Sequence, residues 1–178
     1  MILRTPLRLA GGLTLALLAH QALALPSDAS KPIHISADKL NLDDKAGTAV
    51  YTGNVDMTQG TMLLKANRVD IQRGNNGNVS RVTAIGQGER AYLEQKPNPQ
   101  DSKVQGWGDK VIYHADTRRV ELIGNAKLIQ SPDTFNGAYV EYFLDRRQVN
   151  ARGGKPSSSD SSDQRVEMTL NPQNSQSQ

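Results

Sequence analysis

Apolar side chains recur at every second position along most of the chain. A period of two is typical of β-strands that bury one face, and no window of a dozen residues has the spacing of an amphipathic helix. Turn-forming residues separate these runs at short intervals, as in the segment 74–78. The pattern predicts an all-β domain, an antiparallel sandwich or barrel. The alternating pairs are Ile33 and Ile35, Leu40 and Leu42, Ala49 and Tyr51, Val55 and Met57, Val69 and Ile71, Val111 and Tyr113, Val120 and Leu122, Ala126 and Leu128, and Val140 and Tyr142.

The second half of this domain repeats the first. A shift of 71 residues aligns 37–42 with 108–113 and, without a gap, 53–59 with 124–130. A β unit this short cannot bury its own apolar face, so we expect its copies to stack into an elongated body with sheet edges at both ends. An ordinary sandwich with an old duplication is the alternative. Weaker copies of the first hexapeptide follow after 29 residues in each half, at 66–71 and 137–142.

The first residues are typical of a cleaved secretory signal. Arg4 and Arg8 precede an apolar run over 9–19, and Ala22 and Ala24 supply the small residues that a signal peptidase requires. The run is well short of the roughly 20 residues of a membrane span. We therefore expect residues 1–24 to be removed and the mature chain to be exported, with the periplasm as its predicted location.

The chain changes character near its end. Residues 25–152 form the predicted folded domain, and a Ser- and Asp-rich segment of low complexity follows Gly153. Val166, Met168 and Leu170 alternate once more before a polar tail. The segment 153–178 is thus predicted to be a linker and tail with one weakly held strand.

Composition excludes several classes of function. The absence of cysteine excludes disulfides, thiolate nucleophiles and Cys-ligated metals. Loss of Arg4 and Arg8 would leave 19 basic residues of the 21 against 18 acidic ones, and only 4% of the chain is aromatic. A nearly neutral chain with so few stacking rings does not favour nucleic-acid binding.

Candidate chemistry is sparse. His34 and His114 lie far apart in the sequence, and the pair Asp43 and Asp44 is typical of a solvated turn. The glycines at 86–88 and 106–108 are interpreted as bulges or strand ends, because no helix follows that could hold a phosphate. We expect no catalytic residues, no metal and no cofactor, and therefore a binding protein. A groove of aliphatic side chains with few rings suits flexible alkyl chains.

Four segments follow one another in a distinctive order behind the signal. They are Pro32-Ile33-His34-Ile35, Tyr51-Thr52-Gly53-Asn54-Val55, Thr58-Gln59-Gly60-Thr61 and Leu122-Ile123-Gly124-Asn125-Ala126. In this order they resemble the LptA/OstA-type periplasmic proteins of lipopolysaccharide transport. The resemblance runs from about Lys31 to Arg152, and the polar linker after Gly153 departs from it.

This resemblance implies an open, twisted antiparallel β-jellyroll with an apolar interior. It also implies head-to-tail self-association into a bridge that carries lipopolysaccharide, by its lipid A acyl chains, between the two membranes. The implied partners are an inner-membrane bitopic component and the periplasmic domain of the outer-membrane translocon. The implied energy source is an ATPase beyond the inner membrane, since this sequence has no nucleotide-binding motif.

The inward set of the alternation is the predicted lipid-binding surface, although an ordinary sandwich core would show the same pattern. Ile33, Ile35, Leu93 and Tyr113 are expected near the mouth of the groove because the family pattern implies it. Lys39, Arg68, Lys110 and Arg119 either meet lipid phosphates or are ordinary solvated charges. The complete predicted set is Ile33, Ile35, Tyr51, Val55, Met57, Val69, Ile71, Leu93, Val111, Tyr113, Leu122, Leu128, Phe135, Val140 and Tyr142.

One alternative function remains open at this point. A monomeric periplasmic scaffold or chaperone could pair its sheet edge with a partner and never hold lipid. Lipid binding and concentration-dependent size distinguish the two classes.

Overall fold

The computed structural model describes residues 28–154 and 165–171. The expected signal and most of the polar linker lie outside the described residues. Within them, the only helical element is the short 3-10 turn η1 (Asp28–Ser30), so the prediction of an all-β fold is confirmed. The strands are β1 (Ile33–Ser36), β2 (Lys39–Asp43), β3 (Thr48–Gln59), β4 (Met62–Arg73), β5 (Val79–Ile85), β6 (Ala91–Gln95), β7 (Val104–Gly108), β8 (Lys110–His114), β9 (Arg119–Gln130), β10 (Asp133–Phe143), β11 (Gln148–Arg152) and β12 (Glu167–Thr169).

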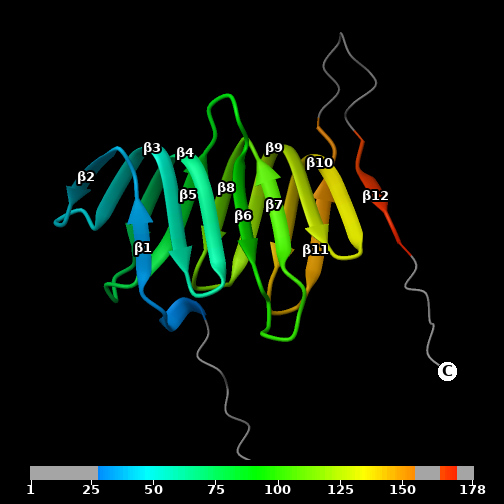
Figure 1. Cartoon of the computed structure of the whole chain (residues 1–178), viewed down its shortest axis with the longest axis horizontal. Coiled ribbons are helices and arrows are strands. Elements are labelled where there is room, and N and C mark those ends of the chain that lie inside the picture. Colours follow the sequence, from blue (N-terminus) through cyan, green and yellow to red (C-terminus); the bar gives the residue numbers. More distant parts are fainter. Residues whose placement is uncertain (1–27, 155–164, 172–178) are drawn as a thin grey trace, which may run out of the picture.

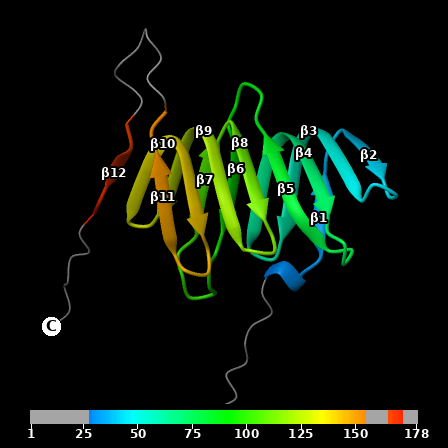
Figure 2. The ribbon, with the colours of Figure 1, turned by 180° about the vertical axis from the view of Figure 1, so that it is seen from behind.

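The strands form one antiparallel sheet that folds over into two layers, as in a β-jellyroll (Figures 1 and 2). The long strands β3, β4, β9 and β10 belong to both layers. The first layer runs β2-β3-β4-β5-β8-β9-β10-β11, and the second runs β1-β3-β4-β6-β7-β9-β10-β12. The body is elongated across the strands, with β1 and β2 at one end and β11 and β12 at the other.

The first bend between the layers lies at Gly53 and Asn54 of β3, whose φ angles are +80° and +44°. The amide N–H of Asp38 donates to the Gly53 carbonyl at 3.0 Å, and Asn54 Nδ2 donates to the Asp38 carboxylate at 3.3 Å. The pairing register of β3 with β4 shifts at this point. A sharp bend of this kind needs residues that tolerate positive φ, which Gly and Asn do.

The second half of the chain repeats this corner in β9. Gly124 and Asn125 have φ angles of +73° and +46°, and the amide N–H of Asp109 donates to the Gly124 carbonyl at 2.9 Å. Asn125 Nδ2 reaches the two carboxylate oxygens of Asp109 at 3.2 and 3.0 Å. The repeat therefore encodes the bends that fold the sheet. All four copies of the hexapeptide lie where the chain passes from the second layer into the first.

The core lies between the layers. Its centre is tightly packed, because an added Cβ at Gly106 of β7 would lie 3.0 Å from Leu122 Cδ2 of the opposite layer. Gly106 is therefore not the bulge or strand end that was expected, because it lies inside β7 and permits close approach of the layers. Gly86 follows the end of β5, as expected. Leu40 and Leu42 are 55% and 54% exposed despite their alternation, because β2 is an edge strand with no further strand beyond it.

The corner geometry predicts that Gly124→Ala destabilises the fold. A Cβ at Gly124 would lie 2.3 Å from Asp109 Oδ2, so the substitution breaks the hydrogen bonds to Asn125 as well as straining the backbone. Gly77→Ala is the matched control, because Gly77 also has positive φ (+78°) but has no atom within 4 Å of the added carbon. We expect urea denaturation to show a loss about 2 kcal/mol larger for Gly124→Ala. Equal losses would contradict this role of Asp109.

Candidate functional site

The two layers are joined by continuous strands along one edge only. Along the opposite edge, the turns of one layer face those of the other, and no strand of the described chain passes between them (Figure 1). We call this the free edge. A layered sheet closed on one side and free on the other can leave a lengthwise opening to its apolar interior.

Two adjoining hollows open this interior near β1 and β2. One has a volume of about 530 Å³ and lies at the end of the body, between β1 and the strands β2 to β5. The other, of about 660 Å³, follows the free edge between η1 and the turns after β4 and β8. Ile33, Arg73 and Val79 line both hollows, so the two hollows adjoin and are together called the groove.

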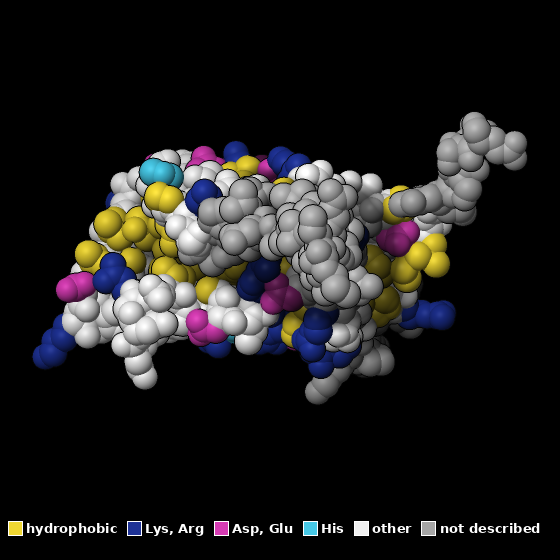
Figure 3. Space-filling model, turned by 90° about the horizontal axis from the view of Figure 1, so that it is seen from below, with side chains coloured by type: hydrophobic (Ala, Val, Ile, Leu, Met, Phe, Trp, Pro, Cys, Tyr) yellow, Lys and Arg dark blue, Asp and Glu magenta, His cyan; other side chains and the backbone are white. Residues whose placement is uncertain are grey.

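Apolar side chains from both layers form the walls of this groove. Ile33 and Ile35 lie on β1 in the second layer, and Tyr51 and Ile71 face them from the first. Seen from below, hydrophobic side chains gather at the left end of the body (Figure 3). The complete apolar and aromatic lining is Ile33, Ile35, Leu42, Ala49, Tyr51, Ile71, Val79, Val82, Tyr113 and Ala115.

Polar groups lie at the rim and base of the groove. Lys31, Arg73 and Asp116 border it, and Arg73 Nη1 lies 3.2 Å from Asp44 Oδ1 in an exposed ion pair. Tyr113 is only 4% exposed at the base, where burial raises the pKa of its hydroxyl. The groove therefore joins apolar walls to a charged border.

The structure divides the predicted lipid-binding set into three groups. Ile33, Ile35, Tyr51, Ile71 and Tyr113 line the groove. Phe135 is half-buried at the opposite end, next to β12. Leu93, expected near the mouth, is 3% exposed within β6 and belongs to the packed core. The others in that core are Val55, Met57, Val69, Val111, Leu122, Leu128, Val140 and Tyr142.

Sequence reasoning missed part of the groove. Leu42 lines the groove, although the predicted lipid-binding set does not include it. The alternation of Leu40 and Leu42 is the sequence signal that could have identified it. Val79 and Val82 also line the groove but are three positions apart, so the period of two does not predict that both face inward. The register of β4 with β5 shifts between Gln72 and Arg73, and this shift breaks the alternation in β5. A local bulge of this kind changes which residues face inward without leaving a clear signal in the sequence.

None of the four basic residues considered for lipid phosphates lines the groove. Arg68 Nε lies 2.8 Å from Asp70 in an ion pair, and Lys39 and Lys110 are exposed. Arg119 takes part in a network on the outer face of the first layer. The charges that border the groove instead come from positions that the sequence analysis did not single out.

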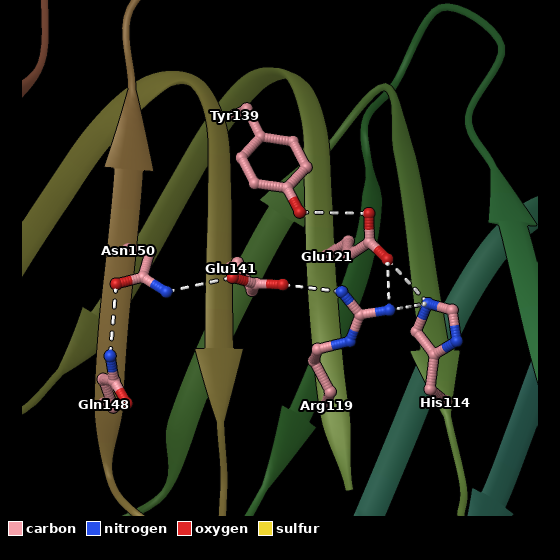
Figure 4. A network of polar contacts seen from close by, with 7 residues as sticks. All are labelled: His114, Arg119, Glu121, Tyr139, Glu141, Gln148 and Asn150. Atoms are coloured by element: carbon pink, nitrogen blue, oxygen red, sulfur yellow. Dashed lines mark hydrogen bonds and ion pairs between the residues drawn. The ribbon is translucent and has the colours of Figure 1, made fainter. Parts of the chain in front are cut away.

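The network around Arg119 links four neighbouring strands (Figure 4). Arg119 Nη1 lies 2.6 Å from Glu141 Oε1, and Arg119 Nη2 lies 3.0 Å from Glu121 Oε1. His114 Nε2 contacts Glu121 Oε1 at 2.6 Å, and Asn150 Nδ2 donates to Glu141 Oε2 at 3.0 Å. These side chains satisfy one another, so the network fastens β11 to β8, β9 and β10.

The described residues offer little for other chemistry. Nowhere in 28–154 or 165–171 do three His, Cys, Asp or Glu side chains gather closely enough to hold a metal ion. The same ranges contain no helix with the length and hydrophobicity of a membrane span. His34, on β1, is exposed.

Comparison with known proteins identifies close relatives. A family model described as "LptA/(LptD N-terminal domain) LPS transport protein" matches residues 34–148. The lipopolysaccharide export system protein LptH of Pseudomonas aeruginosa is 42% identical over 161 residues, which cover 90% of this chain and 91% of that protein. The lipopolysaccharide export system protein LptA of Escherichia coli K12 is 30% identical over 134 residues, or 75% of this chain and 71% of that protein.

A solved structure agrees with these relatives. The crystal structure of LptH, described as the LptA-homologous periplasmic component of the lipopolysaccharide transport device of Pseudomonas aeruginosa, matches with a TM-score of 0.72. The match has 39% sequence identity and covers 83% of this chain and 100% of the crystallised chain. The expected β-jellyroll is thereby confirmed.

The network of Figure 4 predicts a loss of stability in acid. Burial would raise the pKa of Glu141, but hydrogen bonds from Asn150 and Arg119 outweigh it and hold the pKa below the ordinary 4.5. This contribution is therefore full above pH 4.5 and is lost as the pH falls through the lowered pKa. Unfolding followed from pH 7 to pH 3 should depend less on pH in Glu141→Gln than in the native chain. Glu89→Gln, in an exposed loop, is the control, and an equal change in both variants would contradict this assignment.

Proposed function

Because the chain belongs to the LptA/(LptD N-terminal domain) family of lipopolysaccharide transport proteins, we propose that it binds lipopolysaccharide and carries it from the inner to the outer membrane. The names of its relatives, lipopolysaccharide export system proteins LptH and LptA, support the substrate. The role is that of a carrier and not of an enzyme. The periplasmic location rests on the predicted signal at 1–24 and on the description of LptH as a periplasmic component.

The groove is the observation that carries this proposal. An acyl chain of about twelve carbons gains roughly 10 kcal/mol on leaving water, at about 0.8 kcal/mol per CH₂, so a carrier must keep it covered throughout. Side chains such as Ile35, Tyr51 and Val79 can contact such a chain by dispersion without fixing its conformation. Lys31 and Arg73 at the rim supply positive charge for the phosphates of a headgroup that stays in water.

Both ends of the body leave inner-face apolar side chains uncovered. Leu40 and Leu42 are exposed at one end, and Val166, Met168 and Leu170 are 42%, 49% and 64% exposed at the other. Met168 faces inward because it pairs with Phe135, which in turn pairs with the buried Leu128. In the described ranges these five are the exposed large hydrophobic residues, so exposed apolar surface is concentrated at the two ends.

This distribution supports head-to-tail self-association. If β11 of one copy pairs with β2 of the next, and β12 pairs with β1, both layers continue across the junction and the unpaired edges are satisfied. The groove of one copy then meets the interior of the next. Transfer between identical grooves is nearly isoenergetic, so the work that gives direction is done elsewhere, by the ATPase that the family implies.

The ends of such a stack need partners of compatible shape. The family includes the N-terminal domain of LptD as well as LptA, which supports docking of the last copy onto a related domain of the outer-membrane translocon. An inner-membrane bitopic component with an exposed sheet edge would begin the stack in the same way. The competing function, a scaffold that pairs edges without lipid, would require the groove to stay empty.

Photo-cross-linking tests lipid binding directly. A photoreactive residue at Leu42, which lines the groove, should capture purified lipopolysaccharide at least about tenfold more efficiently than one at Asn41. Asn41 is the matched control because it lies next in β2 and points to the opposite face. Equal labelling at the two positions would contradict lipid binding in the groove.

Sedimentation of the chain at increasing concentration tests self-association. We expect the native protein to grow into elongated assemblies and Met168→Glu to weaken association by at least about tenfold, because it places a charge on an apolar surface that the junction covers. Thr169→Glu adds the same charge to the other face of β12 and should associate within about twofold of native. A native chain that stays monomeric at high concentration would favour the scaffold instead.

A further inference from the structure

The free edge is open near β1 but bridged near β11. The loop between β6 and β7, residues 96–103, lies at this edge (Figure 1), contacts two turns of the first layer and is here called the strap. Arg118 Nη2 donates to the Pro97 carbonyl at 3.4 Å, and Arg147 Nη1 lies 3.3 Å from Asp101 Oδ1. Asn98 Nδ2 donates to the other oxygen of Asp101 at 2.8 Å, which fixes the carboxylate within the strap.

The two arginines of this bridge have an unusual backbone conformation. Arg118 and Arg147 have φ angles of +45° and +52°, a region that residues with a Cβ rarely occupy. In the first repeat the position equivalent to Arg118 is Gly47. The carbonyl of Gly47 accepts a hydrogen bond from the amide of Arg73 at 2.9 Å. The carbonyl of Arg118 accepts one from the amide of Leu144 in the same way, at 3.0 Å. The turn therefore needs no arginine for its own hydrogen bonding. The Arg118 side chain is used on both sides of the free edge, because Nη1 forms an ion pair with Asp145 in the neighbouring turn of the first layer and Nη2 contacts the strap.

Two buried polar atoms lie on the inner face of the same half. Gln95 is 2% exposed and its Nε2 donates to Asp28 Oδ2 at 2.9 Å, but its Oε1 has no hydrogen-bond partner among the described residues. Tyr142 belongs to the fully buried core, and its hydroxyl also has no partner among those residues. Gln95 directly precedes the strap in the chain. Tyr142 pairs with Val149 of β11 near the end of β10, so the turn that carries Arg147 follows closely after it. Burial raises the pKa of its hydroxyl. Unpartnered polar atoms are costly in a core that stays closed.

The bridge itself is weak. Arg147 and Asp101 are 54% and 21% exposed, and exposed ion pairs contribute little to stability. The contact of Arg118 to the strap is a long hydrogen bond to a carbonyl. The strap is thus held weakly, and the interior near it contains two buried polar atoms without a hydrogen-bond partner among the described residues.

We propose that the strap is a gate over a second, closed part of the lipid-binding groove. When the contacts of Arg118 and Arg147 break, the strap lifts and the groove extends along the free edge toward β11. Gln95 Oε1 then accepts a hydrogen bond from a hydroxyl or amide N–H group of the lipid. The Tyr142 hydroxyl donates one to an ester or amide carbonyl where an acyl chain joins the sugar headgroup. This inference rests on the proposed function, because it assigns the second site to the same lipid.

Cross-linking the strap shut tests the gate. The chain has no cysteine, so Asp101→Cys/Arg147→Cys can be joined by a short bismaleimide or capped separately with N-ethylmaleimide. We expect the capped variant to load purified lipopolysaccharide at least as fast as the native chain, and the cross-linked variant to load at least about tenfold more slowly. Asp56→Cys/Lys65→Cys is the control, because this exposed ion pair joins β3 to β4 within one layer. Its cross-linking should change loading by less than about twofold.

A milder variant guards against damage from the cross-link. Asp101→Asn should leave the fold intact and speed backbone hydrogen exchange in residues 96–103 by about threefold or more, since it removes the charge that Arg147 contacts. Equal loading by the cross-linked and capped proteins, or unchanged exchange in Asp101→Asn, would overturn the gate while leaving the proposed function standing. Failure of the native chain to load lipopolysaccharide at all would overturn both.

Discussion

The bends that carry four long strands from one layer to the other are the constraint on which the structure depends. In β3 and β9 the bend lies at a Gly-Asn pair with positive φ, and an aspartate across the corner fixes it, as Asp38 does for Gly53. Because the layers are joined along that edge alone, the opposite edge has no covalent closure. The interior is packed where the layers approach closely, as at Gly106 and Leu122, and opens where they diverge near β1.

This geometry relates the fold to lipid transport. A sheet that buries all its apolar side chains would be a stable sandwich with nothing left to bind, and one that buried too few would aggregate through its edges. Here the apolar surface that remains exposed is found in the groove and at the two ends of the body. Both are surfaces that a guest chain or a second copy can cover, so binding and assembly draw on the same hydrophobic driving force.

The sequence predicted the fold well and the site only in part. Alternation identifies which side chains face inward, so the strands, the repeat and the inner set could be predicted from it. It cannot say whether the opposite wall fills the space, and for that reason Ile35 in the groove and Leu93 in the core look alike in the sequence. Val79 was missed because a register shift hides it, and the network around Arg119 depends on pairing across strands that only the structure reveals.

The central claim is that acyl chains lie inside the groove between the layers. Nuclear magnetic resonance can test it by measuring contacts between acyl-chain protons of lipopolysaccharide and side-chain methyl groups of the protein. The account predicts strong contacts to Ile33, Ile35 and Val79, which line the groove, and none to the outer face of the first layer. Contacts confined to that outer face, with the groove methyl groups unaffected by lipid, would contradict it.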